Sequence, residues 1–117
     1  AELIDIPQRR SNRVPIDVLV HTEGFADEGA PVDSALASAQ SMSEESILLE
    51  ASRLLSPQAR GRLQFFLPGS AERLTLEGVV RVSVDEVRLL YVIDLVDLAP
   101  QHRALIRRYI ESQREAA

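Results

Sequence analysis

Polar and hydrophobic residues alternate along four stretches of this chain, as expected for β-strands that bury one face. These stretches are residues 14–22, 62–67, 74–82 and 87–96. The last is the richest in β-branched and large apolar residues, so we expect it to lie centrally in a sheet. Turn-forming residues separate the stretches, notably Leu-Pro-Gly at 67–69 and the polar run at 83–86. Several short strands punctuated in this way favour a small antiparallel barrel or sandwich.

A helix is predicted at the end of the chain. Pro100 suits the first position of a helix, where an N–H is not needed. Arg107 and Glu111 are four residues apart and can pair on the exposed side. The fold class expected from these patterns is all-β with one C-terminal helix packed on the strands. The apolar stripe of this helix comprises Leu105, Ile106, Tyr109 and Ile110.

Three short segments leave the local structure open. Residues 32–40 alternate, but frequent alanine makes that pattern weak. Residues 47–55 carry apolar side chains at helical spacing, with Ser43 in position to cap a helix, and the same letters also fit a short buried strand. In the turn-rich loop that follows the first strand, we expect Phe25 to be an anchor in the core rather than an exposed contact.

The composition indicates one globular domain. With 117 residues, of which 45% are hydrophobic, the chain can bury a substantial core. It has no cysteine and only two histidines, His21 and His102, which excludes disulfides and argues against a zinc site. A net charge of −5, three phenylalanines and two tyrosines argue against a general nucleic-acid binder. No apolar run approaches the roughly 20 residues of a membrane span. Because the sequence starts at Ala1 rather than methionine, we expect either a trimmed chain or a domain excised from a longer protein.

Recognised catalytic motifs are absent from the sequence. It contains no glycine-rich phosphate loop, no GxSxG elbow and no HExxH helix. Many carboxylates are present, but no spacing singles out a pair for acid–base chemistry. We therefore expect a binding domain rather than an enzyme.

Arginines cluster at one place in this acidic chain, in the run Arg9-Arg10-Ser11-Asn12-Arg13 just before the first predicted strand. Arginine presents a planar fork of donors that matches phosphate and the O6/N7 edge of guanine. Such a cluster on an N-terminal arm can close over an anion. A solvated basic turn explains the same spacing, so the local pattern leaves both interpretations open.

The order of these features resembles the PilZ domain family, bacterial receptors for cyclic di-GMP. The resemblance runs from about Gln8 to Ile110. It implies a six-stranded antiparallel β-barrel followed by an α-helix, with residues 1–13 as an arm and residues 14–117 as the barrel and helix. It also implies a strand after the serine-rich motif, so we expect Ser46–Ala51 to be extended. Five segments carry the resemblance: 9–15, 41–50, 63–69, 74–82, and 96–98 with Pro100.

The ligand motif of the family has two parts. The first, RxxxR, is matched by Arg9 and Arg13, to which the resemblance assigns contacts with phosphates and guanine edges. The second is Asp or Asn, any residue, Ser, two residues and Gly, and here its serine is kept as Ser43. Ser41 replaces the Asp or Asn, and Ser46 replaces the glycine. The expected ligand-binding residues are therefore Arg9, Arg10, Arg13, Ser41, Ser43 and Ser46.

Both replacements are expected to weaken binding. A carboxylate at position 41 would accept charge-assisted hydrogen bonds from guanine, and losing such a bond costs about 1.5–3 kcal/mol, or roughly ten- to hundredfold in affinity. Glycine at position 46 would tolerate a positive φ, where serine would be strained by about 1 kcal/mol or more. Glu44 and Glu45 are expected to add negative charge beside the phosphate site.

Two functions from different classes follow from the resemblance. The first is a cytoplasmic cyclic di-GMP receptor, weakened by its serines, that passes the signal to a protein partner. The second is a degenerate PilZ domain acting as a nucleotide-independent adaptor between proteins. A dimerisation unit, using the apolar N-terminal tail and the terminal helix in a homodimer, overlaps the second. Neither function requires a resident cofactor, a metal, or a DNA or RNA partner.

Overall fold

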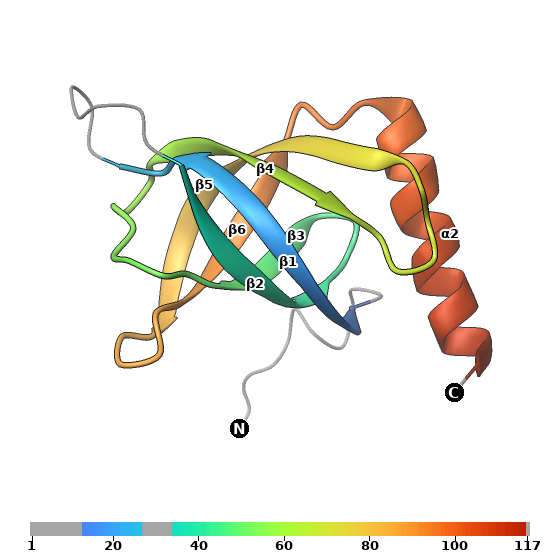
Figure 1. The fold of residues 1–117 in the computed structure, drawn as a ribbon, viewed down its shortest axis with the longest axis horizontal. Coiled ribbons are helices and arrows are strands. Elements are labelled where there is room, and N and C mark those ends of the chain that lie inside the picture. The colour runs from blue at the N-terminus through green and yellow to red at the C-terminus, as the bar shows by residue number, and fades with distance from the viewer. Residues whose placement is uncertain (1–12, 27–33, 117) are drawn as a thin grey trace.

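Six antiparallel strands close into a barrel, and one helix follows them (Figure 1). A computed structural model of the chain describes residues 13–26 and 34–116. The strands follow one another around the barrel in the order β1-β2-β3-β6-β5-β4. The elements are β1 Val14–Gly24, β2 Ser34–Met42, β3 Ser46–Glu50, β4 Arg60–Phe66, β5 Arg73–Asp85, β6 Leu90–Val96 and α2 Pro100–Ala116.

The predicted fold class and all four strongly patterned strands are confirmed, with one boundary misplaced. The turn expected at residues 83–86 lies at 86–89 instead, because β5 continues to Asp85. The side chain of Asp85 accepts hydrogen bonds from the backbone N–H groups of Val87 and Arg88, which fixes the turn at that later point. The hairpin between β5 and β6 is therefore longer than the sequence pattern indicated.

The ambiguous segment after the serine motif is a strand, as the family resemblance implied. β3 pairs with β2 on one side and with β6 on the other, both antiparallel. Ile47 and Leu49 point into the barrel and are fully buried. The helical spacing of the apolar residues misleads locally because pairing on both edges satisfies the backbone and buries alternate residues. Residues 34–42 are also a strand, with the small Ala37 and Ala39 facing inward.

Phe25 anchors the loop after β1, as expected, and its ring is 1% exposed. Its N–H donates to the carbonyl of Arg60, and its own carbonyl accepts from the N–H of Ser56. The neighbouring strand must carry glycine at position 61, because a Cβ there would lie 2.6 Å from the Phe25 ring and from the carbonyl oxygen of Glu23. Phe25 thus helps to fill the barrel interior where β1 and β4 approach most closely.

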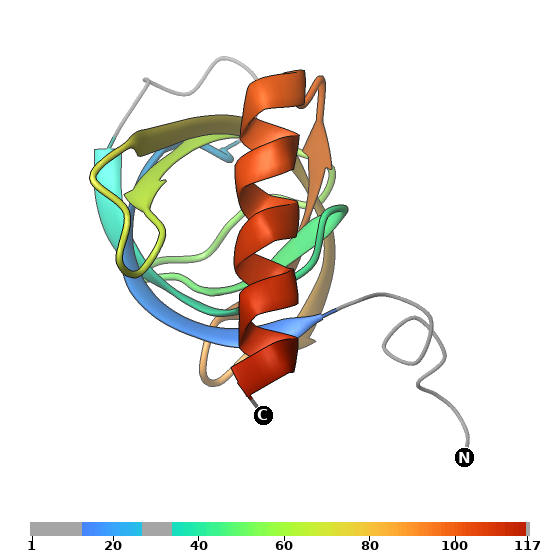
Figure 2. The same cartoon turned by 90° about the vertical axis from the view of Figure 1, so that its right-hand side faces the viewer.

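Helix α2 lies across one open end of the barrel (Figure 2). The predicted apolar stripe faces the strands: Ile106 and Ile110 are buried, and Leu105 and Tyr109 pack partly buried against the same core. Burial raises the pKa of the Tyr109 hydroxyl, because the phenolate would be poorly solvated there. The helix therefore supplies part of the core.

Replacing Ile106 with alanine is expected to lower the free energy of unfolding by about 2–5 kcal/mol. The side chain is fully buried between α2 and the barrel, so its loss leaves a cavity. Urea unfolding of the wild type and the variant measures this difference. The matched change Leu105→Ala removes a partly exposed side chain and should cost clearly less. Equal losses at both positions would contradict the described orientation of the helix.

Candidate functional site

Arg13, just before β1, contacts both positions at which the chain departs from the family motif. Its Nη1 donates to the Oγ of Ser41 at 2.9 Å, and its Nη2 donates to the Oγ of Ser46. Ser41 lies near the end of β2 and Ser46 begins β3. The structure thus brings three of the six residues expected to bind ligand into direct contact, and a fourth, Ser43, is bonded to Ser46. Arg9 and Arg10 lie outside the described residues.

Ser43 builds the turn that holds these strand ends together. Its hydroxyl oxygen accepts hydrogen bonds from the backbone N–H groups of Glu45 at 3.1 Å and Ser46 at 3.2 Å. Its own N–H donates to the carbonyl of Ser46 at 2.9 Å, and the residue is buried. This local bonding is a common way for serine to close a tight turn. The kept serine of the motif therefore has a clear structural task, and its contact with ligand stays a prediction.

The surroundings of Arg13 favour an anion. Burial, and then the positive charge of Arg81, lower the pKa of the Arg13 guanidinium. Among residues 13–26 and 34–116, no carboxylate lies within ion-pair distance of Arg13. Asp94 is hydrogen-bonded to Arg81 Nε at 2.8 Å. Asp94 is also the cross-strand neighbour of Ser46. An anion beside Arg13 would favour the charged form of the guanidinium, which burial and Arg81 disfavour.

Sequence reasoning missed Arg81 and Asp94. They belong to β5 and β6, far along the chain from the arginine cluster, and only closure of the barrel brings them near Arg13. No local spacing in the sequence signals this proximity. A clue would have been an arginine in the middle of an otherwise apolar β-rich stretch.

Glu44 does not add charge beside the arginine site, contrary to the sequence-based expectation. Its carboxylate faces helix α2, where it accepts hydrogen bonds from Arg107 Nη2 at 2.9 Å and Nε at 3.2 Å. Arg103 lies 3.9 Å from the same carboxylate. The hydrogen-bonded partner of Arg107 is thus Glu44, while the predicted partner Glu111 acts only as a further nearby charge. The serine turn is thereby tied to the terminal helix.

This tie predicts a pH-dependent contribution to stability. The hydrogen bond from Arg107 lowers the pKa of the Glu44 carboxyl. A carboxyl with a lowered folded-state pKa stabilises the fold above its unfolded value, about 4.3, and loses that contribution as the pH falls through the folded value. Glu44→Gln should therefore lower the melting temperature at pH 7 but not at about pH 3.

Thermal unfolding at both pH values checks this expectation. The control is Glu45→Gln, which neutralises the exposed neighbouring carboxylate, for which no ion pair is described. The control should not reproduce the pH-dependent difference. A Glu44→Gln variant that melts with the wild type at pH 7 would show that the bridge to α2 contributes nothing.

The backbone strain expected at position 46 is absent. Ser46 lies in β3 with its N–H and carbonyl bonded to Ser43. The non-glycine residues with positive φ in the described chain are Phe25, Gln58, Leu89 and Asp97. The expectation was wrong because the turn is closed by Ser43 before the chain reaches position 46. The serine side chain at position 46 thus affects the site through its hydroxyl and its volume alone.

Comparison with solved structures finds similar folds in other proteins. Inhibitor of motility (MotI/DgrA) from Bacillus subtilis aligns with a TM-score of 0.69 and 14% identity over 92% of this chain and 52% of that one. The PilZ domain of YcgR from Escherichia coli, in a structure with cyclic di-GMP, aligns with a TM-score of 0.66 and 12% identity over 93% and 94%. The chain has a PilZ-like fold. No protein-family model and no curated protein matches the sequence. The chain spans about half the length of MotI.

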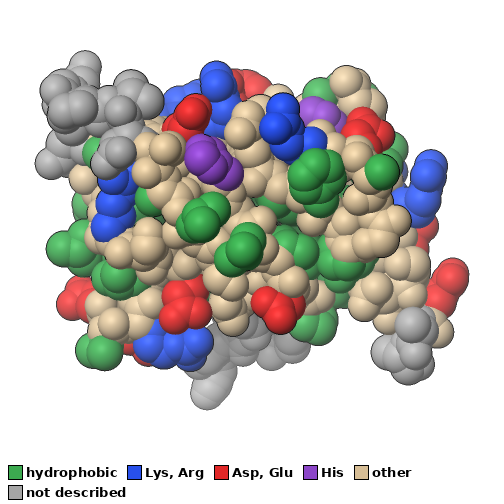
Figure 3. Space-filling view, in the orientation of Figure 1, with side chains coloured by type: hydrophobic (Ala, Val, Ile, Leu, Met, Phe, Trp, Pro, Cys, Tyr) green, Lys and Arg blue, Asp and Glu red, His purple; other side chains and the backbone are tan. Residues whose placement is uncertain are grey.

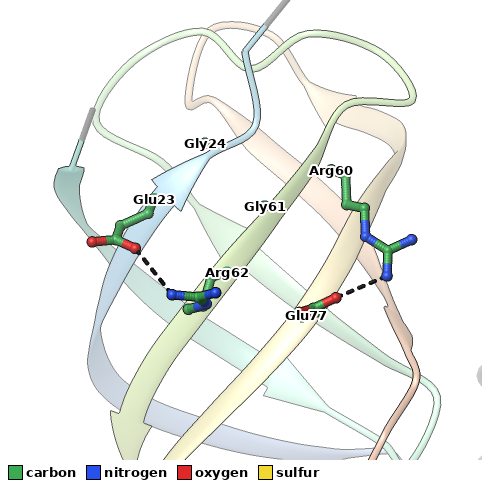
Figure 4. Close-up of a pocket in the computed structure, with 6 residues that line it drawn as sticks. All are labelled: Glu23, Gly24, Arg60, Gly61, Arg62 and Glu77. Atoms are coloured by element: carbon green, nitrogen blue, oxygen red, sulfur yellow. Dashed lines mark hydrogen bonds and ion pairs between the residues drawn. The ribbon is translucent and has the colours of Figure 1, made fainter. Parts of the chain in front are cut away.

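A separate hollow of about 390 Å³ lies on this PilZ-like domain where β1, β4 and β5 run side by side (Figure 4). Its charges are already paired: Arg60 bonds Glu77 at 2.8 Å, and Arg62 lies 3.6 Å from Glu23. Arg60 also bonds Asp97 at 2.7 Å. A ligand here would have to displace these ion pairs, and none of the described residues predicted to bind ligand lines the hollow.

One face of the PilZ-like domain mixes acidic and basic side chains. On the face shown in Figure 3, acidic and basic side chains are interspersed, without a broad basic area that would suit a nucleic-acid backbone. In the described part of the chain, no cluster of three or more potential metal ligands occurs. The described helix is neither long nor apolar enough to cross a membrane.

Proposed function

We propose that this domain is a PilZ-type receptor for cyclic di-GMP, with weakened affinity, that passes the signal to a protein partner in the bacterial cytoplasm. The observation that carries the proposal is the position of Arg13, whose guanidinium meets the side chains of Ser41 and Ser46. These residues come from the two halves of the family ligand motif. The similar PilZ domain of YcgR, whose structure contains cyclic di-GMP, supports the choice of ligand.

The chemistry of the site fits a nucleotide with two phosphates and two guanines. Arg13 would bind a phosphate or a guanine edge through its forked donors, together with Arg9 from the arm. Arg81 adds a second positive charge in the described part of the site, and that charge lowers the pKa of Arg13. An anion beside Arg13 is favoured, because it offsets the repulsion of the two cations in a half-buried setting, while Arg81 itself is paired with Asp94. The role is recognition and not catalysis.

The weakness of the receptor follows from the same hydrogen bonds. Ser41 and Ser46 offer Arg13 neutral acceptors where the family pattern has a carboxylate or amide and a glycine. A ligand must compete for the Nη donors that these hydroxyls occupy. The site also lacks the charged acceptor for guanine N–H groups that an aspartate at position 41 would provide.

The hydrogen bonds of Arg13 also favour a second candidate, a nucleotide-independent adaptor. The half-buried guanidinium already has two protein hydroxyls, those of Ser41 and Ser46, as hydrogen-bond acceptors. A domain that has replaced its ligand contacts by internal ones can keep the fold and present a fixed surface to a partner. In that case, the arginine contributes to the arrangement of the strand ends alone.

A route from the site to a partner runs through the serine turn. The backbone carbonyl of Glu45 accepts from the N–H of Leu95 at 2.9 Å, and Glu44 holds Arg107 on α2. A ligand that shifts Ser41 or Ser46 would therefore also displace the serine turn, which is hydrogen-bonded to β6 and to the helix. We infer that α2 and its exposed face are where the bound state is read.

Isothermal titration calorimetry with cyclic di-GMP tests the proposal. The receptor function predicts a saturable heat with cyclic di-GMP and a much weaker one with cyclic di-AMP, because adenine lacks the O6 acceptor that arginine pairs with. Equal heats with both nucleotides would indicate a phosphate site without guanine recognition. The absence of heat with either nucleotide, for a folded protein, would favour the adaptor.

A further inference from the structure

The last part of β5 is paired on one edge only. β4 accompanies β5 as far as the pair Arg60 and Val79. Two further backbone hydrogen bonds extend the pairing to Val80, whose carbonyl accepts from the N–H of Gln58 and whose N–H donates to the carbonyl of Ala59. Beyond Val80, β5 continues beside β6 alone, within the part of the chain that the structure describes. The segment Arg81–Asp85, which we call the β5 edge, therefore presents a row of main-chain groups toward the outside.

The side chains of the β5 edge are unusually apolar for an exposed strand. Val82 is 48% exposed and Val84 is 56% exposed. Figure 1 shows the hairpin of β5 and β6 extending beyond the barrel wall, away from α2. Proteins usually protect an unpaired edge with charges or a covering segment, since an open β-branched edge is a template for pairing with another strand. This edge has a charge at each end and valines between them.

The order of these residues is self-complementary. In the run Arg81-Val82-Ser83-Val84-Asp85, the charges at the two ends are opposite and the valines are placed symmetrically about the serine. An antiparallel strand of the same sequence, centred on Ser83, puts each Arg81 opposite the Asp85 of the other copy. It also puts each Val82 opposite a Val84. Opposite charges and β-branched pairs are the cross-strand combinations that stabilise antiparallel sheets.

We propose that two copies of this chain dimerise by antiparallel pairing of their β5 edges about a twofold axis at Ser83. The pairing joins the two barrels through their main chains and does not require a bound nucleotide. The assembly stops at the dimer, because a twofold contact uses the same edge on both copies and leaves no β5 edge free for a third copy. The edge is five residues long and carries irregular pairing with β6 between Val80 and Val82 and between Ser83 and Asp85. Such bulges twist a strand edge and hinder the addition of further strands, which keeps the pairing short and opposes fibre growth.

The two charged residues of the β5 edge, Arg81 and Asp85, each keep a hydrogen-bonding atom that their contacts within the chain do not use. Arg81 uses Nε for Asp94, and a guanidinium carries two further nitrogen donors. Asp85 uses Oδ1 for the turn amides, and a carboxylate has a second oxygen. An unrelated extended peptide would find the open backbone but would lack the matched charges, which is why a second copy is the partner we choose.

Charge reversal tests the pairing by sedimentation velocity at protein concentrations up to roughly 1 mM, since an interface this small belongs to the weak class. Arg81→Asp places two aspartates opposite each other, and Asp85→Arg does the same with two arginines. Each variant alone should dimerise about tenfold or more weakly than the wild type. An equimolar mixture of the two variants should recover the dimer, because each strand then faces the opposite charges.

A cysteine at the axis gives a second test that leaves the charges intact. The chain has no cysteine, so Ser83→Cys creates a single thiol. Directly opposed residues in antiparallel strands have Cα atoms about 4.5–5.5 Å apart, within disulfide range. Mild oxidation should convert this variant to a covalent dimer. The control Val87→Cys, in the more exposed turn of the same hairpin, should cross-link far more slowly.

Three results would overturn the proposal. One is a wild type that stays monomeric up to the highest concentration. Another is a dimer that persists unchanged in both single charge variants, which would place the interface elsewhere, for example on α2. The third is equal cross-linking at positions 83 and 87. Loss of nucleotide binding by itself leaves all three readouts unaffected, so failure of the receptor function and failure of the dimer can be told apart.

Discussion

Arg13→Ala is expected to abolish measurable binding of cyclic di-GMP. The guanidinium is the positive group that the structure places directly on Ser41 and Ser46, and a hydrogen bond to a charged group contributes about 1.5–3 kcal/mol. Two such bonds to one ligand would amount to a loss of roughly a hundredfold or more in affinity. Because the serines already weaken the site, this loss takes binding below detection by calorimetry. Arg9→Ala should have the same effect.

The matched control is Arg62→Ala, which removes the same charge at the separate hollow beside Glu23. It should retain wild-type affinity, and Arg10→Ala should weaken binding only slightly, through the net charge. An Arg62→Ala variant that loses binding while Arg13→Ala keeps it would move the site to the hollow. Circular dichroism must show that each variant is folded.

Ser41→Asp is expected to strengthen binding by roughly ten- to hundredfold, by restoring a charged acceptor for guanine N–H groups. The aspartate would also lie beside Arg13 and hold its guanidinium with a charge-assisted bond. Calorimetry against the wild type measures the gain. The control Ser34→Asp adds the same charge at the exposed far end of β2 and should not improve affinity.

Adding Ser46→Gly to this variant should increase the gain further. Removing the hydroxyl frees the second donor of Arg13 and opens space at the start of β3. The gain comes from these two effects and not from the backbone, because Ser46 is an ordinary strand residue. A folded double variant that gives no heat with cyclic di-GMP would reject the idea that these positions limit binding. That result would favour the adaptor function over the receptor function.

Much of the fold could be predicted because short-range pattern and burial agree along most strands. Alternation in β4 placed Leu63 and Phe65 inside, and both are buried. The stripe on α2 likewise packs on the core. The segment after Ser43 could not be assigned by periodicity. A short run of apolar residues fits a helix as well as a strand that is paired on both sides, as β3 is. The family resemblance supplied the missing long-range information there.

The candidate site was only partly predictable, for a different physical reason. The motif identified Arg13, Ser41 and Ser46, and these converge in the structure. The surrounding charges depend on which strands become neighbours, and that is set by closure of the barrel. The proximity of Arg81 and the turning of Glu44 toward α2 therefore appear only in three dimensions.

The measurement that tests the receptor site most directly is a nuclear magnetic resonance titration of the labelled domain with cyclic di-GMP. We expect saturable shifts to concentrate at Arg13, at the segment 41–46, and at Arg81 and Asp94 on the adjacent strands β5 and β6. Smaller shifts are expected on α2 near Arg107. Shifts confined to the hollow lined by Arg60 and Arg62, or no shifts at saturating nucleotide, would contradict the proposed receptor site.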